Sequence, residues 1–194
     1  MENTEDIKDF RKTKYWEYML KKFDEIDNER INFNKDFSSM LLSNTDEMAV
    51  VVKCHLIIEY YIDEYLIAAF PSIKYIDKMN LRFSNKIEMI NNDQTIFGMY
   101  NKSLRQFNSL RNKFAHNLQY VIASNDISDI SCVMDAWNDA GGYTRTKGIE
   151  LIKQYSMWFC SSVFSITNMI NKETKELGIC GYIKWMEEMN RIQT

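Results

Sequence analysis

Turn-forming residues are scarce in this chain, whose 194 residues contain six glycines and one proline, Pro71. A sandwich or barrel of short strands needs a turn about every 8 to 12 positions, so this scarcity argues against all-β folds. Twelve Met, eleven Phe and eleven Tyr supply bulky side chains for a core without the β-branched excess that strands favour. We therefore expect an all-α protein, and the length suits one domain with a sizeable core.

The charge balance argues against a protein that binds nucleic acid over its whole surface. Twenty-four Lys and Arg stand against twenty-seven Asp and Glu, a formal net charge of −3, so any contact with nucleic acid must be local. The cysteines form no CxxC pair and are expected to be reduced thiols in the cytoplasm. They are Cys54, Cys132, Cys160 and Cys180. No secretory signal is visible, and charges interrupt the longest apolar stretch, residues 48–70, which argues against a membrane partner.

Apolar periodicity predicts the order of the helices. An amphipathic helix is expected over residues 7–33, a second from the cap candidates of Ser43–Glu47 to Pro71, a short one over 83–91, and a long one over 95–123. A short helix before Gly141, a long one after Lys147 and a last one at Tyr182–Met189 complete the series. The second helix is apolar around most of its circumference, so we expect it at the centre.

These helices predict one domain in three parts. Residues 1–45 are expected to form an N-terminal helical arm, residues 46–140 the helical core, and residues 141–194 further helices that pack on that core. No phosphate-binding loop, dinucleotide-binding motif or zinc-peptidase motif is present, so no cofactor and no metal are expected.

The segment from Leu104 to Leu118 carries an apolar stripe at helical spacing. At about 100° per residue its members fall within roughly 60° of one another, and they are expected to face the core. They are Phe107, Leu110, Phe114 and Leu118.

Three polar residues lie elsewhere on the same helix. His116 falls opposite the stripe, Asn112 is its neighbour four residues earlier, and Arg111 lies at the edge of the stripe. His116 is therefore expected to face water, a second subunit or another helix.

The segment Arg111–His116 resembles the signature of the HEPN superfamily, an Arg, a polar residue, and a His after four to six intervening positions. The surrounding segments HLIIEYYIDEYL, FSNKIEMI and SNDISDISC resemble the mannitol-operon-repressor-like branch, and the likeness spans residues 47–137. The resemblance implies a HEPN-like helical bundle, metal-independent RNA cleavage and a homodimer in which two motifs face one cleft. It assigns the catalytic roles to Arg111, Asn112 and His116.

The chemistry of these side chains agrees with that implication. Cleavage of an RNA phosphodiester needs a base for the 2′-hydroxyl, an acid for the leaving oxygen and positive charge near the phosphorane. His116 can exchange a proton near neutral pH, and Arg111 can bind phosphate oxygens through two donors. Asn112 could orient the imidazole or hold a phosphate oxygen. One helix offers one His, and the implied dimer would supply the second.

Two functions follow as alternatives. The first is a ribonuclease that serves as a toxin or antiphage defence effector, with RNA as substrate and an antitoxin or sensor protein as a further partner. The second is a non-catalytic regulator like the mannitol operon repressor, or a protein-interaction module, in which Arg111 and His116 are ordinary surface residues.

A second polar constellation lies on the predicted central helix. His55, Glu59 and Asp63 follow one another at four-residue steps and form one polar stripe. Buried polar groups need partners, so Glu59 and His55 either orient Arg111 or His116, or the stripe forms a buried salt bridge with a Lys or Arg. A metal site on this stripe is the least favoured interpretation, because the sequence shows no motif that would supply further metal ligands.

Overall fold

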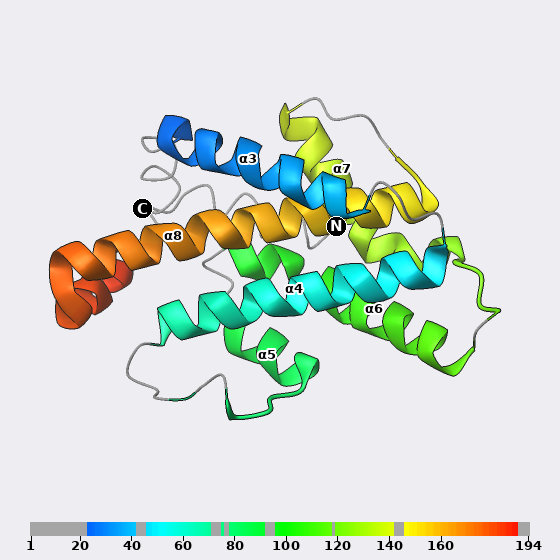
Figure 1. Ribbon diagram of the computed structural model, residues 1–194, viewed down its shortest axis with the longest axis horizontal. Helices are drawn as coiled ribbons and strands as arrows, with labels where there is room; N and C mark the ends of the chain where they lie inside the picture. The colour runs from blue at the N-terminus through cyan, green and yellow to red at the C-terminus, as the bar shows by residue number, and fades with distance from the viewer. Residues whose placement is uncertain are drawn as a thin grey trace.

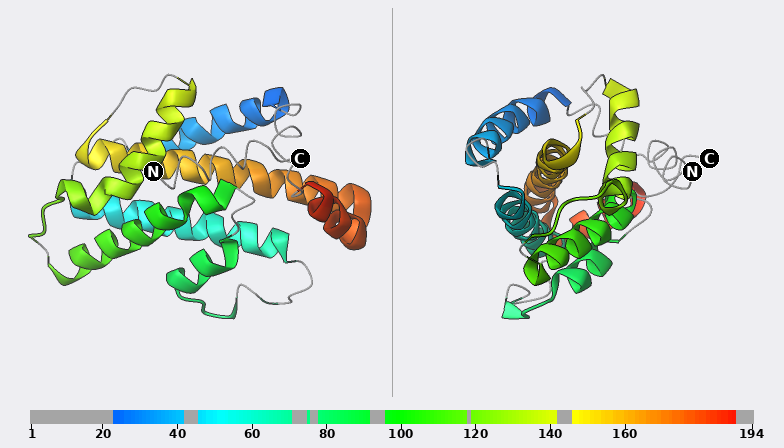
Figure 2. Two further views of the ribbon diagram at one scale, coloured as in Figure 1. Left: turned by 180° about the vertical axis from the view of Figure 1, so that it is seen from behind. Right: turned by 90° about the vertical axis from the view of Figure 1, so that its right-hand side faces the viewer.

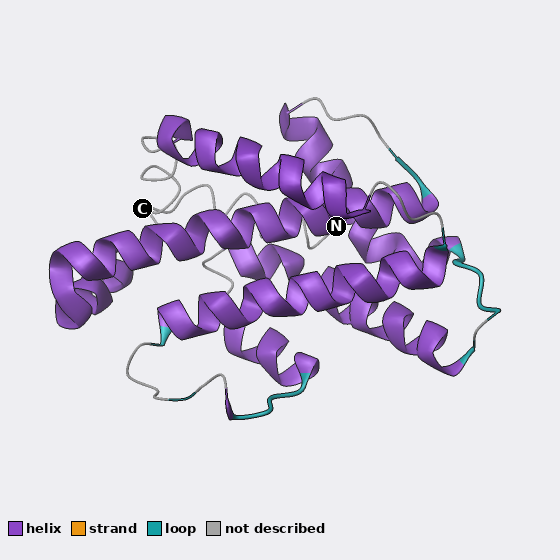
Figure 3. Ribbon diagram, in the orientation of Figure 1, coloured by secondary structure: helices purple, strands orange, loops and turns teal. Residues whose placement is uncertain are grey.

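The computed structural model describes residues 23–41, 46–70, 75, 78–91, 96–117, 119–141 and 146–189. Helices and connecting loops make up these ranges, and no strand occurs within them (Figure 3). The predicted all-α class is confirmed. None of the helices in these ranges is both long and apolar enough to span a lipid bilayer.

Helix α8 (Gly148–Met189) is the element on which the bundle is assembled (Figure 1). Helices α3 (Phe23–Leu41) and α4 (Glu47–Ala69) pack along one side of α8, and α7 (Ser128–Gly141) packs on another side (Figure 2). The apolar residues that α8 buries are Leu151, Ile152, Tyr155, Trp158, Phe159, Cys160, Val163, Ile166, Met169 and Ile170.

Helix α6 (Ile96–His116) lies beside this assembly and carries the motif. It packs against α4, against the short α5 (Phe83–Ile90) and against α7, which follows the 3-10 turn η2 (Ser124–Ile127). The polar stripe of α4 and the motif of α6 therefore belong to neighbouring helices.

The start and end of α4 follow the sequence signals. Asp46 is the N-cap, and its Oδ1 accepts a hydrogen bond from the backbone N–H of Ala49 at 2.7 Å. The helix ends at Ala69, two residues before Pro71, because a proline disfavours helical backbone in the residue that precedes it.

The expectation that α4 lies at the centre needs correction. It packs on α8, α5 and α6, but Leu56, Tyr60 and Ile67 are 60 %, 56 % and 44 % exposed. These residues share one stripe of the helix that faces outward. The more enclosed helix is α8, in which none of residues 151–170 is exposed.

Three helix boundaries also differ from expectation. The described part of the first helix continues past Phe33 to Leu41, because Phe37 and Leu41 extend its buried stripe; residues 7–22 lie outside the described residues. Residues 182–189 belong to α8 instead of forming a separate helix, although Figure 1 shows the ribbon turning in this last part. Gly178 and Gly181 each cost a helix only about 1 kcal/mol, which is too little to end it.

The third difference concerns the motif helix. It was expected to reach Ala123 but ends at His116, and residues 120–123 are not helical. The carboxylate of the buried Asp126 accepts hydrogen bonds from the Tyr120 hydroxyl and from the backbone N–H of Ala123, which holds this segment in a non-helical path.

Cys54, Cys132 and Cys160 are free thiols, as expected. Burial raises the pKa of Cys54 to about 11 and raises that of Cys160 well above its ordinary value. Since the thiolate is the reactive form, both are inert packing residues. The side chain of Cys180 lies outside the described residues.

Candidate active site

The apolar stripe of α6 points into the core as predicted. Phe107, Leu110 and Phe114 are buried, and Phe107 stacks on Tyr155 of α8 with ring centroids 6.1 Å apart. Leu118, the fourth predicted member, lies outside the described residues. The rotation of α6 is thereby fixed, and with it the directions in which the motif residues leave the helix.

His116 is the last residue of α6, and its side chain is exposed. It forms no hydrogen bond or ion pair with the other residues that the structure describes. The expectation that it faces away from the core is confirmed. Lys113 shares this last turn, where basic side chains are favoured by the partial negative charge of a helix C-terminus.

Arg111 and Asn112 lie one turn earlier and contact each other. Arg111 is half-buried, and its Nη1 donates a hydrogen bond to Oδ1 of the exposed Asn112 at 3.0 Å. Asn112 is thus engaged by Arg111 and not by the imidazole of His116. Five residues advance a helix by about 140°, so Arg111 and His116 leave α6 in different directions.

His55 of α4 lies on the Arg111 side of α6. It is 3 % exposed, and its ring contacts Phe83 and Phe107, with centroids 4.3 Å and 6.3 Å away. Burial lowers the pKa of His55; Glu59 opposes this effect and the positive charge of Arg111 adds to it. The imidazole is therefore neutral at pH 7 beside the guanidinium. Its Nε2 has no hydrogen-bond partner in the described part of the chain.

The other two residues of the polar stripe bind a cation that the sequence analysis did not single out. Nζ of the buried Lys86 lies 2.8 Å from the carboxylates of both Glu59 and Asp63. Burial alone would lower the pKa of Lys86, but the hydrogen bonds to Asp63 and Glu59 outweigh it and raise the pKa. The salt-bridge interpretation of the stripe is correct for these two carboxylates.

The positioning interpretation of Glu59 and His55 is not excluded by this salt bridge. The positive charge of Arg111 contributes to the lowered pKa of His55, and Glu59 Oε2 lies 3.8 Å from His55 Nδ1. That Glu59 and His55 orient Arg111 stays a prediction. No group of three His, Cys, Asp or Glu side chains is placed to hold a metal ion within the described ranges, so His55, Glu59 and Asp63 form no such site.

Lys86 had a signal in the sequence. It falls between Phe83 and Ile87 on the buried side of α5, and a lysine in such a stripe indicates a buried acidic partner. The acidic stripe of α4 was the available partner.

Asp126 is a second residue that sequence reasoning missed. It is buried, and Lys113 Nζ, the Tyr120 hydroxyl and the Ala123 N–H all donate to its carboxylate. Burial would raise the pKa of Asp126, but these three hydrogen bonds outweigh burial and lower it. The residue fastens the segment after His116 to the last turn of α6. Its signal was an Asp three residues after Ala123, where the sequence predicts the end of the helix.

A hollow of about 430 Å³ opens between α6, η2 and α7. The basic residues Lys102, Arg105 and Lys113 line it, together with polar and acidic side chains. Ser109 also lines it, and His116 follows Ser109 and Lys113 at helical spacing. The exposed imidazole is therefore on the same face of α6 as the hollow, one turn beyond it.

The cations of the hollow carry counter-charges. Arg105 is paired with Glu88 and Lys113 with Asp126. The Arg105 and Glu88 side chains are 48 % and 55 % exposed, and such pairs contribute little, so a phosphate can replace the carboxylate at small cost. Asp126 is buried and keeps its lysine in place.

The arrangement on one chain thus offers an exposed imidazole, a hollow lined by Lys, Arg and Asp side chains on the same helix face, and a guanidinium on another face. It shows no contact between the side chains of Arg111 and His116 within the described ranges. Comparison with models of protein families, with curated proteins and with solved structures finds no match to this chain.

Proposed function

We propose that this chain is a metal-independent endoribonuclease of the HEPN type that acts as a homodimer. The observation that carries the proposal is His116, an exposed imidazole that has no partner among the described residues and lies at the end of a helix face with Lys102, Arg105 and Lys113. A solvated histidine can exchange protons with a substrate, whereas the buried His55 cannot reach one.

The reaction is a transesterification. One imidazole takes the proton of a 2′-hydroxyl, whose oxygen attacks the adjacent phosphorus. The bond from phosphorus to the 5′-oxygen breaks, and an acid gives that oxygen a proton. The products are a 2′,3′-cyclic phosphate and a 5′-hydroxyl end, and the positive charge of an arginine stabilises the phosphorane between them.

The position of Arg111 supports a second copy as part of the site. Arg111 and His116 of one chain leave the helix about 140° apart, so α6 of one chain does not direct both side chains toward one scissile phosphate. Two copies of α6 meeting across a two-fold axis bring the residues of one chain toward those of the other. The second copy also supplies the second imidazole.

The experiment is RNA cleavage in EDTA. Purified protein should cut single-stranded or structured RNA without added metal and leave cyclic phosphate ends. His116→Ala and Arg111→Ala should each lower the rate about 10²-fold or more. Gln119→Ala, an exposed residue just beyond α6, is the matched control and should be as active as the wild type. Cleavage that requires a divalent ion would refute the mechanism.

We further propose that the enzyme serves as an RNase toxin or antiphage effector in the cytoplasm, under the control of an antitoxin or sensor protein. Growth arrest on expression, relieved by His116→Ala, tests that role. The second candidate is the non-catalytic regulator. The hydrogen bond from Arg111 to Asn112 favours it, because this bond already satisfies a donor of the half-buried guanidinium within the fold. In that case Arg111→Ala lowers stability and no RNA is cut.

A further inference from the structure

A groove with a volume of about 400 Å³ lies between α3 and α4. Its floor is aromatic. Phe33 of α3 stacks on Phe164 of α8 with centroids 5.2 Å apart and meets Tyr61 of α4 edge-on at 5.2 Å. Rings that hold one another in this way form a preshaped apolar surface, and aromatic residues are enriched at protein interfaces.

The rim of the groove is apolar and acidic. Met40, at the C-terminal end of α3, is 47 % exposed. Glu29 and Asp36 line the same side of the groove, and they lie seven residues, or about two helical turns, apart on α3. Burial raises the pKa of Tyr61 to about 12, and the negative charges of Glu64 and Asp36 add to the rise.

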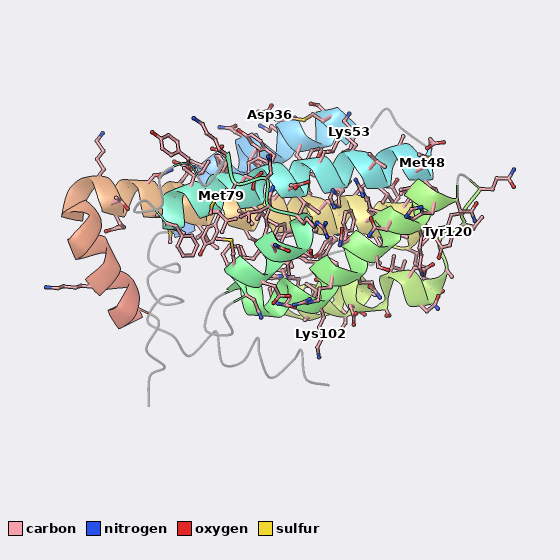
Figure 4. The ribbon with its side chains drawn as sticks, turned by 90° about the horizontal axis from the view of Figure 1, so that it is seen from below. Asp36, Met48, Lys53, Met79, Lys102 and Tyr120 are labelled. Atoms are coloured by element: carbon pink, nitrogen blue, oxygen red, sulfur yellow. The ribbon has the colours of Figure 1, made fainter. Side chains whose placement is uncertain are left out.

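A cation lies at one end of the groove. Lys53 of α4 donates from Nζ to the backbone oxygen of Met40 at the end of α3 (Figure 4), whereas Glu29 and Asp36 line the groove at earlier positions of α3. The groove therefore presents an apolar floor between exposed carboxylates. The partner chemistry that complements it is large apolar side chains flanked by positive charge.

We propose that this groove is the docking site for an amphipathic helix of a partner protein, with large apolar residues on one face and Lys or Arg beside them. A helix places such anchors at positions i, i+3, i+4 and i+7, and a groove between two helices receives them as a row. The proposal does not depend on ribonuclease activity. Asp36 and Lys102, which line the groove and the basic hollow, lie at opposite edges of the molecule (Figure 4).

The probe is a synthetic helical peptide with Leu at those four positions and Lys or Arg on the flanks, labelled with a fluorophore. Its binding to the full chain is measured by fluorescence anisotropy. Met40→Glu should weaken binding about tenfold or more, since it puts a charge where an apolar anchor is buried. Asp36→Lys should weaken it about threefold or more, and added salt should weaken binding to the wild type.

Two controls make the test specific. Ile31→Glu alters a residue of the same helix that is equally exposed, at 48 %, but does not line the groove, so it should bind like the wild type. A peptide with Glu in place of Lys and Arg should bind more weakly than the basic one. The proposal is overturned if the basic peptide shows no binding below about 1 mM. It is equally overturned if Ile31→Glu and Met40→Glu bind alike, or if the acidic peptide binds as well.

Discussion

Removing the buried ammonium of Lys86 should destabilise the fold measurably. Lys86→Met keeps the length of the side chain but leaves Glu59 and Asp63 without the cation that lies 2.8 Å from each. Breaking a fully buried ion pair costs about 3–5 kcal/mol. Here the two acidic side chains are 28 % and 39 % exposed, so water takes over part of the lost interaction. We expect a loss of about 2 kcal/mol in the free energy of unfolding.

Urea denaturation followed by circular dichroism measures this loss. A loss of about 2 kcal/mol in a chain of this size lowers Tm by roughly 4–8 °C, with an unchanged urea m-value. The matched control is Arg105→Met, which breaks the exposed pair with Glu88 and should cost at most about 1 kcal/mol. If Lys86→Met is as stable as Arg105→Met, the bridge across α4 and α5 does not stabilise the fold and the reasoning is refuted.

Three further predictions concern the packing of the fold. The folded chain resists protonation of His55, whose pKa is lowered from 6.5, while the unfolded chain accepts it; stability should therefore fall as the pH drops below 6.5, and His55→Gln should flatten that fall in urea titrations at several pH values. Phe107→Ala should cost about 3–5 kcal/mol in the same assay, because the side chain is fully buried against Tyr155. In native protein a thiol reagent followed by mass spectrometry should label the half-buried Cys132 before Cys54 and Cys160; equal rates would contradict their burial.

Local patterns predicted much of the fold because they act over short distances. The cap at Asp46, the end of α4 before Pro71 and the buried face of α6 each depend on residues within a few turns of one another. The end of α6 at His116 could not be read in this way. It depends on Asp126, whose carboxylate binds Lys113 and Tyr120 across a loop.

In the candidate site, too, the features that depend on one helix could be predicted, and those that depend on packing between helices could not. Helical spacing was enough to place His116 and Asn112 on the outer face of α6, because both lie on one regular element. The partner of Glu59 and Asp63 was out of reach, since Lys86 comes from another helix and only tertiary packing selects it among the cations of the chain. The exposed apolar stripe of α4 could not be predicted either, because apolar composition does not distinguish a buried helix face from a face that no other element covers.

A mixed dimer tests most directly the claim that two copies pool their α6 residues at one RNA phosphate. Wild-type and His116→Ala chains carrying different affinity tags are co-expressed, and the heterodimer is purified through both tags. If each site needs an imidazole from both copies, the heterodimer should cleave RNA in EDTA at a few per cent of the wild-type rate or less, in line with the loss of a general acid or base. A heterodimer that retains half of the wild-type rate would contradict the shared site and show that each chain works alone.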